Sequence, residues 1–60
     1  MNSKKVIKIL ENEGWVIDRM TKHCIMKKDG RIVPIPIHGS KDLPIGTLKS
    51  ISKMTGVKLP

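Results

Sequence analysis

The chain has 60 residues, enough for one domain over residues 1–60, and a domain this small buries only about 60% of its unfolded surface. Its twelve Lys and Arg residues against five Asp and Glu residues give a net charge of +7, which favours nucleic acid, an acidic protein or an anionic membrane surface as partner. One cysteine excludes an internal disulfide, and no apolar stretch approaches the ~20 residues of a membrane span, so we expect a cytoplasmic protein with no membrane partner.

The segment between Ser3 and Gly14 has the pattern of an amphipathic helix. Ser3 is a candidate N-cap, and Gly14 follows the segment where a left-handed C-terminal cap is common. Val6, Ile7 and Leu10 fall on one side of such a helix. We therefore expect this side to pack against the rest of the domain.

Three strands are predicted next, at residues 15–20, 22–28 and 31 to about 37. Asp29 and Gly30 separate the last two strands, and Asp-Gly is a strong signal for a two-residue hairpin turn. A turn at these two residues fixes the register of the hairpin, because each residue before the turn then has one defined partner after it. In this register His23 lies opposite Pro36.

Side chains alternate between the two faces of a strand, so the register also assigns each residue to a face. One face is uniformly apolar and consists of Cys24, Met26, Val33, Ile35 and Ile37. The other face is mixed and consists of His23, Ile25, Lys27, Ile32, Pro34 and Pro36. The apolar set must face the helices, so we expect His23 to stand on the open face of the sheet.

Pro34 and Pro36 indicate that the third strand lies at an edge of the sheet. In the predicted register, both backbone nitrogens point away from the second strand, where proline removes no ladder hydrogen bond. The same prolines would block pairing with a further strand.

A second helix is predicted from a start near residues 44–47 to an end before Gly56. Its inward stripe consists of apolar residues about three apart, namely Ile45, Leu48, Ile51 and Met54. The fold class is therefore α+β in the order α-β-β-β-α, with a three-stranded antiparallel sheet and two helices on one face. This plan resembles the double-stranded-RNA-binding domain at the level of fold alone.

His23 and His38 are candidates for acid–base chemistry, because histidine has an unperturbed pKa of about 6.5. RNA cleavage needs an acceptor for the 2'-hydroxyl proton, a donor for the leaving oxygen and positive charge for the phosphate. Arg19, Lys22 and Lys27 lie near His23 in the chain or in register. The alternatives are an exposed surface histidine at position 23, and simple loop polarity for His38 rather than a second proton-transfer or RNA-contacting role.

Cys24 is adjacent to His23, but consecutive strand residues point to opposite faces, which excludes a Cys-His dyad. We therefore assign Cys24 to the core. The histidines, the cysteine and the carboxylates show no metal-ligand spacing, and we expect neither a metal nor a cofactor.

The chain from Ser3 to about Val57 resembles the HicA (YcfA-like) toxin family in the order and spacing of several short motifs. These motifs are Gly14-Trp15, Arg19, His23, Asp29-Gly30 and the segments 35–39 and 41–51, of which Ile45-Gly46-Thr47-Leu48 with Ile51 is the most specific. The resemblance implies a fold like the double-stranded-RNA-binding domain and cleavage of mRNA by His23. It also implies inhibition by a HicB-type antitoxin in a hetero-oligomer. The family usually has Gly-Ser before its histidine, whereas this chain has Thr21-Lys22.

Two functions are therefore considered first. One is an endoribonuclease toxin with His23 as general acid or base, and its candidate RNA contacts are Arg19, Lys22, Lys27 and His38. The other is a non-catalytic RNA-binding module that uses the same basic surface. A third class, an interaction protein with an acidic partner, would have no RNA affinity at low salt. For the toxin, we expect the antitoxin to cover the sheet face near His23 rather than extend the sheet along the third strand.

Overall fold

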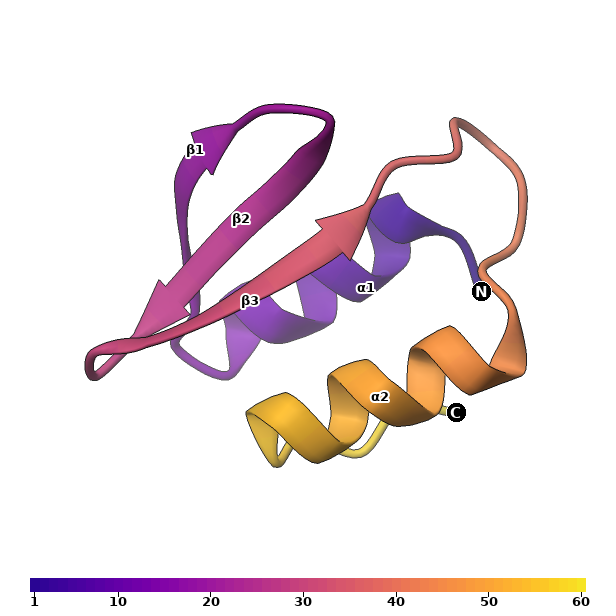
Figure 1. The fold of residues 1–60 in the computed structure, drawn as a ribbon. Helices are drawn as coiled ribbons and strands as arrows, with labels where there is room; N and C mark the ends of the chain where they lie inside the picture. Colours follow the sequence, from indigo (N-terminus) through magenta and orange to yellow (C-terminus); the bar gives the residue numbers. More distant parts are fainter.

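The computed structural model describes residues 1–60, and its elements are α1 (Ser3–Asn12), β1 (Val16–Met20), β2 (His23–Lys28), β3 (Arg31–Pro36) and α2 (Ile45–Thr55). The strands form one antiparallel sheet in the order β1-β2-β3. Both helices lie on the same side of this sheet and contact β3 (Figure 1). The predicted α+β fold, with its order of elements, is confirmed. Neither helix combines the length and the apolar character that crossing a bilayer would require.

The helix α1 is capped by a different residue from the one predicted. Its N-cap is Asn2, whose Oδ1 accepts a hydrogen bond from the backbone N of Lys5 at 2.9 Å, and Ser3 is the first helical residue. Asparagine and serine are about equally good caps, so the consecutive residues Asn2 and Ser3 leave the first residue of the helix ambiguous by one position. Gly14 has the predicted positive φ, at 96°.

The hairpin of β2 and β3 has the predicted register along its whole length, from the turn to His23 opposite Pro36. Asp29 and Gly30 have φ values of 50° and 79°, and two successive positive φ angles are what a type I' turn requires. The strand β3 is an edge strand, as the two prolines indicated.

The buried apolar residues form one core cluster, made of Val6, Leu10, Trp15, Cys24, Met26, Val33, Ile35, Leu43, Leu48 and Ile51. Four of the sheet residues predicted to face the helices belong to this cluster. The fifth prediction is wrong: Ile37 is 41% exposed, because β3 ends at Pro36 and the alternation of faces ends with it. Leu43, which lies between β3 and α2, is a core residue that the strand and helix patterns did not indicate.

The inward stripe of α2 is only half right. Leu48 and Ile51 are buried as predicted, whereas Ile45 is 72% and Met54 44% exposed. The reason is geometric: three residues fall about 60° short of a full helical turn, so a strict three-residue repeat drifts around the helix and its first and fourth members lie on opposite sides. Thr55, four residues after Ile51, completes the buried face.

Two basic residues flank the hairpin turn and hold the ends of the helices. Lys28 Nζ donates to the backbone oxygen of Glu13 at the C-terminus of α1, at 2.7 Å. Arg31 Nη2 donates to the backbone oxygen of Met54 in the last turn of α2, also at 2.7 Å. A cation at a helix C-terminus is favourable because the unpaired carbonyls carry partial negative charge.

Candidate functional site

His23 begins β2 at the end of the sheet away from the hairpin turn, and it is exposed. Cys24 and Met26, the first and third residues after His23 in β2, are fully buried on the helix side, and by alternation His23 therefore stands on the open face. Burial, with a smaller contribution from the Glu11 carboxylate, raises the pKa of the Cys24 thiol. Cys24 is therefore a protonated core residue, as expected, and not a nucleophile.

Thr21 holds the turn that precedes His23. The backbone N of Thr21 donates to the backbone oxygen of His23 at 2.9 Å. The Thr21 hydroxyl lies 3.3 Å from both backbone polar atoms of His23, accepting from the amide and donating to the carbonyl. One hydroxyl can do both, because it carries a donor hydrogen and acceptor lone pairs. One residue of the unusual Thr21-Lys22 pair thus fixes the backbone of the histidine.

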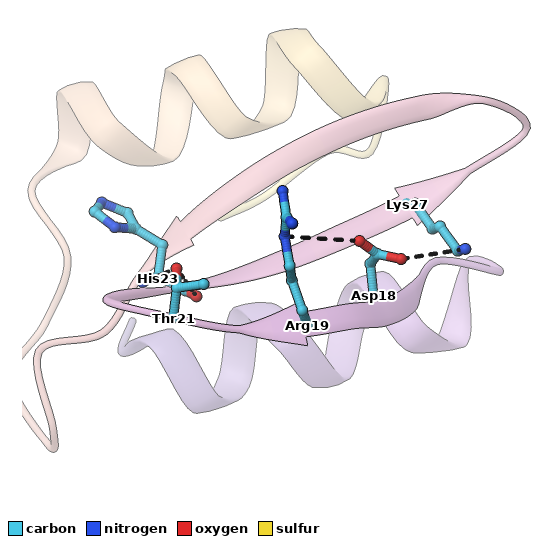
Figure 2. A network of polar contacts seen from close by, with 5 residues as sticks. All are labelled: Asp18, Arg19, Thr21, His23 and Lys27. Carbon is cyan, nitrogen blue, oxygen red and sulfur yellow. Dashed lines mark hydrogen bonds and ion pairs between the residues drawn. The ribbon is translucent and has the colours of Figure 1, made fainter.

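Arg19 and Lys27 share a carboxylate, that of Asp18. Its Oδ1 lies 3.2 Å from Lys27 Nζ, and its Oδ2 lies 4.0 Å from Arg19 Nε. Figure 2 shows these three side chains and His23 on the same side of the sheet. The strand β1 has a bulge at this point, because Ile17 pairs with Met26 but Arg19 pairs with Ile25.

The bulge explains how Asp18 reaches the site. In a regular strand, consecutive residues point to opposite faces, so Asp18 and Arg19 would be separated by the sheet. One extra residue in β1 removes this alternation and lets both side chains stand on the open face. The sequence has no glycine here to mark a bulge, and Asp18, although a poor strand residue, was read as part of the strand surface and was missed as a member of the site.

The charged groups form a row along the open face and do not converge on one point. His23, Ile25 and Lys27 occupy alternate positions of β2. Four residues of strand separate His23 from Lys27, which is about 13 Å at 3.3 Å per residue. Arg19 pairs with Ile25, between these two ends. Lys27 and His23 therefore stand at opposite ends of the row.

The other two predicted RNA contacts lie at the His23 end of the sheet. Lys22 is exposed in the turn between β1 and β2, next to His23. His38 is exposed two residues beyond Pro36, the partner of His23, in the loop after β3. The side chains of Lys22, His23 and His38 make no hydrogen bond or ion pair within the chain. All three are free to contact a ligand.

No three His, Cys, Asp or Glu side chains come together as possible ligands of a metal ion. The surface has one distinct hollow, of about 380 Å³, between α2 and the C-terminal residues, and it is lined by Ile45, Leu48, Lys49, Ser52, Lys53, Leu59 and Pro60. None of these residues belongs to the open face of the sheet. The candidate site is thus an exposed surface, which suits an extended polymer better than a small enclosed ligand.

A family model described as HicA toxin of bacterial toxin-antitoxin matches residues 3–57, a stretch that includes both helices and the whole sheet. Comparison with curated proteins gave no match, and comparison with solved structures gave none either.

Proposed function

Because this chain belongs to the HicA toxin family of bacterial toxin–antitoxin systems, we propose that it is an mRNA interferase, an endoribonuclease that cuts RNA with His23 as general acid or base. The observation that carries the proposal is the exposed His23 imidazole at one end of a basic row on the open face. In this proposal the reaction uses no bound metal and no cofactor.

The proposed reaction is attack of an RNA 2'-oxygen on the adjacent phosphorus, with departure of the 5'-oxygen. Neutral His23 would accept the proton of the attacking hydroxyl while water protonates the leaving oxygen, or protonated His23 would donate a proton to the leaving oxygen while water accepts that of the hydroxyl. An imidazole without a partner in the chain suits either step, because no internal hydrogen bond must first be broken. The contacts of Thr21 with the backbone of His23 would fix the point from which the ring extends.

The proposed RNA contacts are Arg19, Lys22, Lys27 and His38. Lys22 is next to His23 in the chain and would contact the phosphate at the cleavage point or its neighbour. Lys27 is about 13 Å further along β2 and would bind a different phosphate of the same strand. Since these are contacts of cations with a polyanion, affinity should fall steeply as salt rises.

Membership of the family implies an antitoxin partner. We propose that this partner is a HicB-type protein that forms a hetero-oligomer with the toxin and covers the open face near His23. Continuation of the sheet beyond β3 is disfavoured, because Pro34 and Pro36 lack the amide hydrogens that a further strand would need. We also propose that the protein acts in the cytoplasm.

A cleavage assay on single-stranded RNA with the wild type and His23→Ala tests this function. Removal of the acid–base group should lower the rate by about 10²- to 10⁴-fold. Thermal unfolding and RNA affinity should stay close to wild type, because the ring is exposed and its side chain makes no hydrogen bond within the chain. Growth arrest on expression should likewise disappear with His23→Ala, and for the wild type it should be relieved by co-expressed antitoxin.

Three results would contradict the proposal. If His23→Ala cleaves RNA as fast as the wild type, the histidine is not the catalytic group. If the wild type binds RNA at low salt and leaves it intact, the protein is the non-catalytic RNA-binding module that the same basic surface would also serve. Absence of any RNA affinity would point to the third class, an interaction protein with an acidic partner.

A further inference from the structure

Asp18 is the one acidic residue that stands among the cations of the open face. The chain has five acidic residues, and the other four lie elsewhere: Glu11 and Glu13 at the end of α1, Asp29 in the hairpin turn, and Asp42 beside the N-terminal amine. Asp18 contacts Lys27 and Arg19, two of the four proposed RNA contacts.

We propose that Asp18 is an internal competitor of RNA: its carboxylate occupies the position that a phosphodiester oxygen takes when RNA binds to Lys27 and Arg19. The inference rests on the proposed function only in taking RNA as the ligand, and it does not require that the RNA is cut. Carboxylate and phosphodiester groups both present two anionic oxygens to Lys and Arg donors, so one can replace the other.

The geometry favours replacement over a permanent ion pair. The side chains of Lys27 and Arg19 are 53% and 71% exposed, so a ligand can reach both cations, whereas the Asp18 side chain between them is 30% exposed. Ion pairs in such exposed positions are weak, since water and salt screen them. A phosphate with neighbours on the same strand can therefore displace the carboxylate, because the neighbours are held at the same time by other cations of the face.

Competition by Asp18 has a consequence for ligand choice. An isolated small anion that displaces the carboxylate gains contacts at this one position only. An RNA strand long enough to reach from His23 to Lys27 gains several contacts from the same displacement. Asp18 would thus weaken binding of all anions but leave a preference for strands that span the open face.

The test compares Asp18→Asn with the matched control Asp29→Asn in binding to a 2'-O-methyl RNA oligonucleotide, which lacks the attacking hydroxyl and cannot be cut by this reaction. Both substitutions remove one negative charge, and asparagine suits the positive φ of the hairpin turn at position 29. Dissociation constants are measured at several salt concentrations between about 50 and 200 mM.

Asp18→Asn should bind the oligonucleotide about 3- to 10-fold more tightly at low salt, as expected for cations released from weak exposed pairs. The slope of log K against log salt should become steeper by up to about 0.7 for each released cation, the value for single strands. Asp29→Asn should change affinity less than about 2-fold and leave the slope unaltered, because Asp29 forms no ion pair with any cation of the row and its removal releases none. Adding Lys27→Met to Asp18→Asn should abolish most of the gain.

Other outcomes overturn the inference. Equal gains for Asp18→Asn and Asp29→Asn would show an effect of net charge alone, and weaker binding by Asp18→Asn would show that the carboxylate orders the cations for RNA. Absence of RNA binding by every variant would also overturn it. Thermal melts check folding, and Asp18→Ser serves as a second variant if the amide disturbs the bulge. Failure of the proposed function is seen separately, as intact RNA in the cleavage assay of the wild type.

Discussion

Basic side chains at the two ends of the sheet have different partners. At the hairpin end, Lys28 and Arg31 donate to backbone carbonyls at the C-termini of α1 and α2. At the opposite end, the side chains of Lys22 and His23 make no hydrogen bond or ion pair within the chain. The net charge of a small basic protein thus overstates its binding surface, because some of its cations hold the fold together.

The largest effect on stability is expected for the double variant Lys28→Met, Arg31→Met at the hairpin end. Both helix C-termini lose a charged donor, and we expect a loss of about 1–2 kcal/mol in the free energy of unfolding. RNA cleavage by the folded protein should stay within about 2-fold of wild type, since neither residue is part of the proposed site. Chemical denaturation and a cleavage assay well below the melting temperature measure the two quantities.

Lys22→Met is the matched control from the other end of the sheet. It should leave the unfolding free energy within about 0.5 kcal/mol of wild type, because Lys22 is exposed and unpaired. Its RNA affinity should fall, with a smaller dependence on salt. If the hairpin-end variant loses RNA affinity and Lys22→Met does not, the assignment of the two ends is wrong.

A smaller effect is expected at Thr21, which belongs to the His23 end but touches only backbone atoms of the histidine. Thr21→Val keeps the shape and removes the hydroxyl, so the cleavage rate should fall about 3-fold, the equivalent of one net hydrogen bond of roughly 0.5–1.5 kcal/mol. Thr21→Ser keeps the hydroxyl and should restore the rate, while RNA affinity stays unchanged in both. Equal cleavage rates for Thr21→Val and Thr21→Ser would show that the Thr21 hydroxyl does not position His23.

The part of the fold that could be predicted is the part fixed by local rules. Asp29-Gly30 specifies a two-residue turn, and from that turn the pairing of β2 with β3 and the open-face position of His23 follow by alternation. The edge position of β3 follows in the same way. Proline has no N–H group, so it fits only where the backbone nitrogen points away from the sheet, and an edge strand alone has such positions.

The parts that could not be predicted depend on contacts between elements. The bulge that brings Asp18 beside Lys27 interrupts the alternation rule, and nothing in the neighbouring residues marks the interruption. Lys28 and Arg31 donate to carbonyls at the ends of the helices. These contacts depend on where the helix ends lie in space, which a sequence pattern does not specify. In both cases the residue type was visible, but its partner was not.

The central claim, that RNA binds the open face along the row from His23 to Lys27, is tested most directly by following backbone amide resonances during titration with the 2'-O-methyl RNA oligonucleotide. We predict that the largest shifts occur at residues 19–23 and at Lys27, with small shifts at Arg31 and in α2. Large shifts centred on α2 or α1, with the amides around His23 unmoved, would contradict the account.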